Sequence, residues 1–153
     1  MKNLLTFSLI LFCVACSSTK PPQYASGGNG DDLIPYAKSL IGTPYHYGGE
    51  SPKTGFDCSG FVRHVFNHTR GVHLPRTALA ISRTGTKIKA NQMQPGDLVF
   101  YSTQGTPYSH VGIFLGNAHF IHSPSTGKKV EIVDMSQDYW REHYNGARRI
   151  LSR

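Results

Sequence analysis

The sequence predicts an α+β domain, with helices in its first half and an antiparallel sheet in its second. Between residues 32 and 82, apolar residues recur at helical spacing. After Pro95-Gly96, short β-prone runs follow one another, and turn residues separate most of them. Helices followed by a series of strands are typical of an α+β domain and not of alternating βαβ units.

The first helix is expected over about residues 32–41. Its apolar residues share one face, an aspartate can cap its start, and Gly42 can end it. The stretch after it, residues 42–56, is so rich in glycine and proline that we expect no regular element there.

The second helix is expected to begin beside Cys58. Asp57 stands where an N-cap residue would, and an apolar stripe follows, made of Phe61, Val62, Val65 and Phe66. A third, short helix is expected from Thr77 to Ser82. Cys58 is therefore expected at or near the N-terminus of an amphipathic helix.

The β-prone runs are expected to form the sheet. They cover residues 98–101, 111–115, 118–122, 130–133 and 149–151. Gly116-Asn117 suits a tight hairpin between the second and third runs. These two strands are therefore expected to be antiparallel neighbours.

The chain is expected to divide into a leader, a tether and one folded domain. Residues 1–15 have the basic start, apolar stretch and small residues of an export signal. The letters CVAC at its end resemble a bacterial lipobox, so we expect Cys16 to be lipidated and to begin the mature protein; an ordinary secretory signal is the alternative. Residues 16–31, rich in serine, proline and glycine, are the expected tether, and residues 32–153 the expected folded domain. Ser17 resembles the residue that follows the lipidated cysteine in outer-membrane lipoproteins.

The charge of the chain is basic but dispersed. Sixteen Lys and Arg against nine Asp and Glu give a net charge of +7. No basic helix or base-stacking motif is visible, so nucleic acid is not an expected partner. A basic surface instead suits an anionic membrane and an acidic wall polymer.

Cys58 is the candidate nucleophile. If Cys13 leaves with the signal and Cys16 is acylated, Cys58 has no partner for a disulfide. An unpaired thiol in an oxidising compartment is a liability unless it is buried or used. At a helix N-terminus, free N–H groups and the helix dipole are expected to lower the pKa of the thiol and to raise its reactivity. An inert, buried thiol is the structural alternative.

Two of the eight histidines are candidates for the base and its orienting group. His110 and His122 lie in the two strands expected to pair through the Gly116-Asn117 turn, which leaves them adjacent or diagonal. His119 competes with His122, because side chains alternate along a strand and spacing alone does not decide which faces the cysteine. The histidines show no ligand spacing with a second cysteine, so neither a metal nor another cofactor is expected.

Six motifs carry a resemblance to the NlpC-type cell-wall endopeptidases. They are GTPYHYGG at 42–49, DCSGFV at 57–62, LPRT at 74–77, PGDLVF at 95–100, SHVGIF at 109–114 and FIH at 120–122. They follow the order of the family with similar intervals and span nearly all of the chain after residue 31. The resemblance implies a papain-like fold, in which the helix that bears the nucleophile packs against an antiparallel sheet.

The resemblance also implies roles for individual residues. Cys58 matches the nucleophile, His110 the general base, and His122, in preference to His119, the residue that orients the base. Tyr45 matches the tyrosine that helps to hold the oxyanion, with Tyr47 as its alternative because this loop varies in length. The positions that line the substrate cleft match Asp57, Ser59, Arg76 or Thr77, and Ser109.

The implied activity is hydrolysis of peptide bonds in the stem peptides of peptidoglycan, commonly between D-isoglutamate and meso-diaminopimelate. The enzyme is expected on the periplasmic face of the bacterial cell envelope, held at the outer membrane by the lipid on Cys16. Two alternatives belong to other classes: a catalytically silent wall-binding lipoprotein, and an amidase or lipid acyltransferase on the same scaffold.

Overall fold

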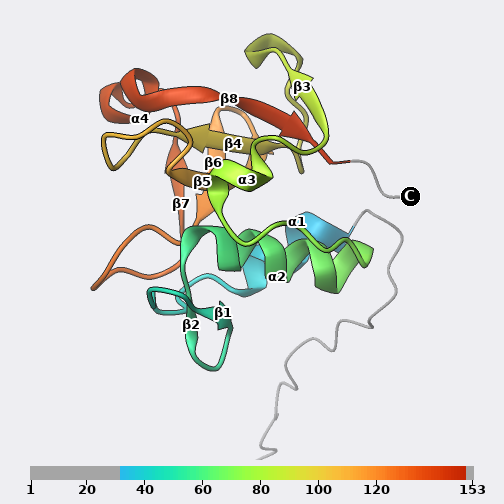
Figure 1. Ribbon diagram of the computed structural model, residues 1–153, viewed down its shortest axis with the longest axis vertical. Coiled ribbons are helices and arrows are strands. Elements are labelled where there is room, and N and C mark those ends of the chain that lie inside the picture. Colours follow the sequence, from blue (N-terminus) through green and yellow to red (C-terminus); the bar gives the residue numbers. More distant parts are fainter. Residues whose placement is uncertain (1–31, 151–153) are drawn as a thin grey trace, which may run out of the picture.

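The computed structural model describes residues 32–150, in which helices and a sheet form two layers (Figure 1). The elements are α1 (Leu33–Ser39), β1 (Glu50–Ser51), β2 (Gly55–Phe56), α2 (Cys58–Arg70), α3 (Ala78–Ile81), β3 (Thr86–Ile88), the 3-10 helix η2 (Ala90–Gln92), β4 (Leu98–Tyr101), β5 (His110–Gly116), β6 (His119–His122), β7 (Glu131–Asp134), α4 (Asp138–His143) and β8 (Tyr144–Arg149). The expected signal peptide, lipidated Cys16 and tether lie outside the described residues. None of the helices within 32–150 has the length and apolar character that crossing a membrane requires.

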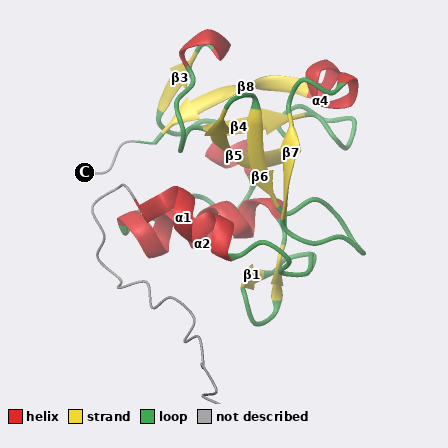
Figure 2. Cartoon of the chain, turned by 180° about the vertical axis from the view of Figure 1, so that it is seen from behind, coloured by secondary structure: helices red, strands yellow, loops and turns green. Residues whose placement is uncertain are grey.

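The main sheet has six strands in the order β3-β8-β4-β5-β6-β7, and each pair of neighbours is antiparallel. Strands β4 to β7 form a meander, and β8 returns to lie between β3 and β4. The helices α1 and α2 lie together against one side of this sheet, as the two opposite views show (Figures 1 and 2). The α+β prediction is confirmed.

Two apolar clusters hold the layers together. The larger one lies between the helices and the sheet, and α2 contributes Phe61, Val62, Val65 and Phe66, all fully buried. Burial of each such side chain stabilises the fold by about 2 kcal/mol. The smaller cluster covers the other face of the sheet, where Trp140 of α4 packs against Tyr101 and Phe120. The apolar stripe predicted for α2 is thus the face that fixes this helix on the sheet.

The helices agree with their sequence predictions to within a few residues at each end. Asp57 caps α2, and Thr77 caps α3. The hairpin between β5 and β6 is also present, with Asn117 and Ala118 at its centre at φ 48° and 57°. Positive φ at both central residues suits the right-handed twist of the strands. The turn is therefore as tight as predicted but lies one residue further along.

Three strand predictions were wrong or incomplete. Residues 42–56 do hold an element, the short hairpin of β1 and β2. The edge strand β3 was missed, and β8 begins at Tyr144 and not at Arg149. Neither segment has the alternation of a half-buried strand, because β3 is short and largely exposed, and β8 contains asparagine, glycine and two arginines. Their pairing with each other and with β4 makes them strands.

Candidate active site

The site begins at the N-terminus of α2, where Asp57 is the N-cap residue. Its Oδ1 accepts the N–H of Gly60 at 2.7 Å, and its Oδ2 accepts the N–H of Gly48 at 3.0 Å. The Ser59 hydroxyl donates to Oδ1 at 3.1 Å. These bonds tie the loop before α2 to the first turn of the helix, and Cys58 is the first residue of that turn.

Arg76 brings a positive charge to Asp57. Its Nη2 lies 2.6 Å from Asp57 Oδ2, and its Nη1 donates to Ser59 Oγ at 2.9 Å. Burial by itself would raise the pKa of the Asp57 carboxyl, but the hydrogen bonds from Arg76, Gly60 and Ser59 outweigh it and lower the pKa. Asp57 is therefore a carboxylate at neutral pH, although it is buried.

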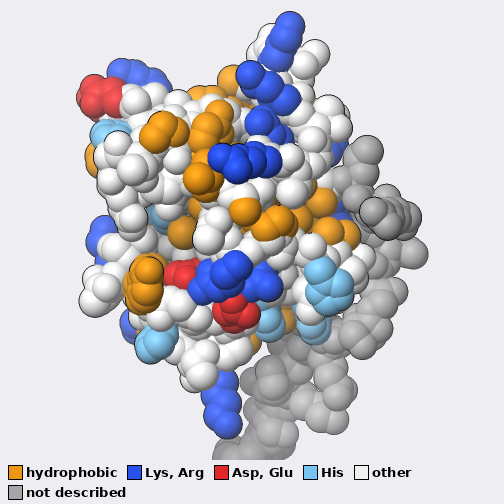
Figure 3. Space-filling model, in the orientation of Figure 1, with side chains coloured by type: hydrophobic (Ala, Val, Ile, Leu, Met, Phe, Trp, Pro, Cys, Tyr) orange, Lys and Arg blue, Asp and Glu red, His pale blue; other side chains and the backbone are white. Residues whose placement is uncertain are grey.

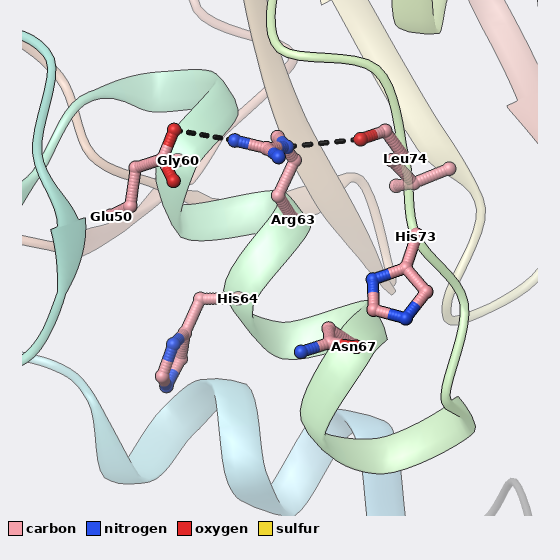
Figure 4. Close-up of a pocket in the computed structure, with 7 residues that line it drawn as sticks. All are labelled: Glu50, Gly60, Arg63, His64, Asn67, His73 and Leu74. Atoms are coloured by element: carbon pink, nitrogen blue, oxygen red, sulfur yellow. Dashed lines mark hydrogen bonds and ion pairs between the residues drawn. The ribbon is translucent and has the colours of Figure 1, made fainter.

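Two more charged side chains, Glu50 and Arg63, extend the ion-pair network outward from Arg76. Glu50 Oε1 lies 2.6 Å from Arg76 Nε and 2.5 Å from Arg63 Nη1. Arg63 also donates to the carbonyl oxygen of Leu74 (Figure 4). Basic side chains stand against acidic ones on the face seen in Figure 3. None of the predicted site residues lines the hollow in Figure 4, where Arg63 is held by Glu50 and by the carbonyl oxygen of Leu74.

A close backbone contact sets the position of the loop that carries Tyr45. The carbonyl oxygen of Gly49 accepts the N–H of Asp57 at 3.1 Å and lies against Gly60, where an added Cβ would come within 1.9 Å of it. Only glycine at position 60 allows this approach. The loop is thereby fixed over the start of α2, and Tyr45 lies beside Cys58.

Cys58 itself is partly buried and lies next to β5. The pKa of the Cys58 thiol is raised to about 11, because burial and then the Asp57 charge outweigh the N–H groups of Val111, Ser59 and Cys58, which lower it. The expectation of a lowered pKa is therefore wrong for the free protein. The helix N-terminus does supply N–H groups, but burial against the sheet outweighs them. The thiol rests in its neutral form.

His110 and His122 meet through a short hydrogen bond. The register of β5 and β6 pairs Ile113 with Ile121, which places the two histidines diagonally on one face. His110 Nε2 and His122 Nδ1 are 2.7 Å apart, and both rings are buried. Burial lowers the pKa of His110 to about 4, and burial together with the charges of His110 and Lys128 lowers the pKa of His122. Both imidazoles are therefore neutral at pH 7, as a base must be.

His119 takes no part in this pair. Its side chain is exposed at the other end of β6, and its Nδ1 lies 2.6 Å from the carbonyl oxygen of Asn117. Of the two histidines that spacing left open, His119 and His122, it is His122 that contacts His110.

Two neighbouring hollows surround these residues. The first, which we call the Cys58 hollow, has a volume of about 410 Å³ and is lined by Tyr45, Tyr47, Gly48, Asp57, Cys58, Ser59, Arg76, Thr77, Ala78, Gln104 and Ser109. It brings together all the predicted site residues of residues 32–150 except the two histidines. The second, the His122 hollow, has a volume of about 500 Å³ and includes His110, His122, Lys128, Glu131 and Trp140. Gln104 lines both, so the hollows adjoin.

The predicted cleft residues differ in how exposed their side chains are and in whether their hydroxyls already form hydrogen bonds. Tyr45 is half-buried, and burial followed by the charge of Cys58 raises the pKa of its hydroxyl, whereas Tyr47 is 85% exposed. The Thr77 hydroxyl accepts the N–H of Ala80, and the Ser109 hydroxyl accepts the N–H of Gln104. Geometry therefore favours Tyr45 over Tyr47 as the hydroxyl beside the thiol.

Sequence reasoning missed several residues of the site. Trp140 stacks edge-on against His122 with ring centroids 5.2 Å apart and lies 6.0 Å from the ring of His110. Glu131 and Gln104 line the hollows without belonging to any motif. The single tryptophan of the chain was the one signal available, because a tryptophan in a polar segment has to find a partner surface.

The comparisons with known proteins agree with this geometry. The model of the NlpC/P60 family matches residues 42–149, most of the chain. The chain belongs to the NlpC/P60 family. This is a family of cysteine peptidases, so the prediction of both the family and the enzyme class is confirmed.

Individual NlpC/P60 proteins share between a third and a half of the matched residues. Murein DD-endopeptidase MepH of Escherichia coli K12 is 45% identical over 115 residues, which are 73% of this chain and 42% of the relative. Gamma-DL-glutamyl hydrolase of Bacillus subtilis 168 is 42% identical over 118 residues, 76% of this chain and 28% of the relative. The structure of an NlpC/P60 family protein from Bacillus cereus ATCC 10987 superposes with a TM-score of 0.74 at 35% identity, covering 80% of this chain and 40% of that one. The chain thus spans less than half the length of these three proteins, and the papain-like fold prediction is confirmed.

Proposed function

We propose that this chain is a cysteine endopeptidase that hydrolyses peptide bonds in peptidoglycan stem peptides. The observation that carries the proposal is the buried His110–His122 pair, together with a thiol at a capped helix start that meets the N–H of Val111, the neighbour of His110 on β5. The relatives named murein DD-endopeptidase and gamma-DL-glutamyl hydrolase support the reaction, and the first of them also supports the polymer.

The geometry suggests a role for each residue in the reaction. The Nε2 of His110 is taken by His122, so its Nδ1 is the nitrogen left to accept the proton of Cys58. The thiol sulfur then attacks the amide carbon, and the Tyr45 hydroxyl and N–H groups at the start of α2 stabilise the oxyanion. The imidazolium of His110 next protonates the leaving amine, and water releases the acyl group. Because thiol and imidazole rest neutral, the proton moves as attack occurs.

For the bond itself, we propose the one between D-isoglutamate and meso-diaminopimelate. The relative named gamma-DL-glutamyl hydrolase favours a γ-glutamyl bond. The relative named murein DD-endopeptidase favours the cross-link instead, and this is the second candidate. We further propose that lipidation of Cys16 holds the enzyme at the outer membrane, facing the periplasm. Loss of radiolabelled palmitate in Cys16→Ala would support this anchor, and retention of the label would refute it.

One digestion tests the proposed activity. Residues 17–153 and the Cys58→Ser variant are incubated with purified peptidoglycan, and the soluble products are read by mass spectrometry. Fragments cut after D-isoglutamate establish the proposed bond, whereas intact stems released from cross-linked dimers establish the cross-link. Free sugar strands would show an amidase, and acylated lipid in a parallel incubation with phospholipid vesicles would show an acyltransferase. No product from a folded, thiol-reactive chain would show a silent wall-binding protein.

Two histidine variants test the proposed roles within the same assay. His122→Ala is expected to abolish most of the activity, and His119→Ala to leave it close to that of the parent chain. The opposite result, with both variants folded, would show that His122 is not the orienting residue.

A further inference from the structure

The Nε2 atom of His122 is a buried polar atom that no hydrogen bond accounts for. Its Nδ1 is taken by His110, but its Nε2 is buried and has no hydrogen-bond partner among the described residues. The side chain is fully buried. A buried N–H without an acceptor is costly, so native structures rarely retain one without a reason.

The proton on that nitrogen follows from the proposed function, on which this inference rests. His110 must keep Nδ1 free to receive the thiol proton, so its own proton sits on Nε2 and is donated to His122 Nδ1. His122 then accepts at Nδ1 and carries its proton at Nε2. The unpartnered atom is therefore a buried donor on the side of the ring away from His110.

Glu131 carries a carboxylate that lies within ion-pair distance of His122 Nε2. Residues His122 and Glu131 are directly opposite each other in the pairing of β6 and β7, and both line the His122 hollow. Glu131 Oε1 lies 3.9 Å from His122 Nε2, just too far for a hydrogen bond. The Glu131 side chain is 47% exposed and so is free to change rotamer. A small rotation closes the gap.

Glu131 is the one carboxylate among the described residues that line the His122 hollow. Lys128 is cationic and disfavours a proton on His122. Tyr139 and Trp140 of α4 present aromatic surfaces to the same hollow. Asp134, the other acid of β7, lies opposite His119 at the far end of the strand and accepts the N–H of Ser136.

We propose that Glu131 is a positioning residue, whose carboxylate accepts the Nε2–H of His122 when His110 takes up the thiol proton. As the S–H bond breaks and the S–C bond forms, the proton goes to His110 Nδ1. His110 keeps its Nε2–H directed at His122, and His122 keeps its Nε2–H directed at Glu131, so no proton reaches the carboxylate. Its negative charge stabilises the imidazolium and opposes the charge of Lys128.

The test compares Glu131→Gln with Asp134→Asn, two variants that each lose one charge from β7 without changing side-chain size. For Glu131→Gln, kcat is expected to fall roughly tenfold with little change in KM, because a weaker partner lowers the basicity of the histidine pair by about one pKa unit. The acid limb of the kcat profile is expected to move to lower pH by about the same unit. Asp134→Asn is expected to match the parent chain in both.

A second measurement does not depend on catalysis. Titration of the imidazole ¹⁵N signals in the free protein should show a lower pKa for the His110–His122 pair in Glu131→Gln and no change in Asp134→Asn. Glu131→Asp, which keeps the charge, should restore part of this shift and part of kcat. If Glu131→Gln raises KM while kcat and the titration stay unchanged, Glu131 binds the substrate and the inference is overturned. If the parent chain cleaves nothing but the titration still shifts, the proposed function fails and the link from Glu131 to His122 stands.

Discussion

Replacing Asp57 by asparagine should lower the stability of the fold and raise the reactivity of the Cys58 thiol. The amide oxygen can still cap α2 by accepting the N–H of Gly60. The amide nitrogen, however, would face donors, because Oδ2 now accepts from both Gly48 and Arg76. The variant therefore keeps the cap and loses the buried charge with its second set of hydrogen bonds.

The magnitude follows from these contacts. Two charge-assisted hydrogen bonds from Arg76 are weakened, at 2.6 and 3.2 Å, which at about 1.5 kcal/mol each gives a loss near 3 kcal/mol. Arg76 retains Glu50 as a partner, so the free energy of unfolding should fall by about 2–3 kcal/mol and not by the larger amount of a stranded buried charge. The Asp57 charge also raises the pKa of Cys58, so its removal should lower that pKa. At a fixed pH, alkylation of Cys58 by iodoacetamide should become faster.

Urea denaturation measures the first effect, and mass spectrometry of the alkylated chain at pH 8 measures the second. Glu50→Gln is the matched control, because it removes an acid from the same arginine at an exposed site. It should cost less than about 1 kcal/mol and leave alkylation unchanged. A loss below about 1 kcal/mol in Asp57→Asn, or slower alkylation in a folded variant, would refute this account of the site.

Three more outcomes are expected. Gly60→Ala should lower the free energy of unfolding, measured in urea, by about 2 kcal/mol or more, because the new Cβ meets the Gly49 oxygen at 1.9 Å. Alanine normally favours a helix, so the loss would come from this contact. The control Gly71→Ala, strained only by φ 62° at the end of α2, should lower the free energy of unfolding by about 1 kcal/mol. The alkylation rate of Cys58 should rise about tenfold per pH unit from 7 to 9 without a plateau, since its pKa is raised to about 11; a plateau near pH 8 would contradict the burial argument. Stability should fall as the pH drops from 6.5 towards 4, because His110 is protonated in the unfolded chain but stays neutral when it is buried in the folded one. The loss from this group is about 3 kcal/mol. Equal urea midpoints at pH 6.5 and 4.5 would contradict this prediction.

The part of the site that could be predicted is the part encoded locally. Asp57 and Cys58 are adjacent in sequence, and an N-cap followed by an apolar stripe is a short-range signal that fixes the start of α2. The pairing of His110 with His122 depended on one tight turn, whose residues favour positive φ. The error of one residue in the turn did not matter, because diagonal neighbours on one face still meet.

The state of the thiol could not be predicted in this way. A helix N-terminus argues for a lowered pKa, and that argument holds only for a thiol in contact with water. Cys58 instead lies against β5, a strand more than fifty residues away, and its burial reverses the sign. Likewise Arg76 reaches Asp57, and Trp140 reaches His122, across separations that no periodicity encodes.

By itself the sequence determined the α+β class, the start of the nucleophile helix, the hairpin that brings His110 near the strand of His119 and His122, and the family resemblance, because each depends on capping, alternation, turn chemistry or short motifs. Only the tertiary structure decided how deeply Cys58 is buried, that Arg76 holds Asp57 ionised, and that Glu131 stands opposite His122. The physical reason is that burial and electrostatics depend on which distant segments pack together, and packing is a property of the whole fold.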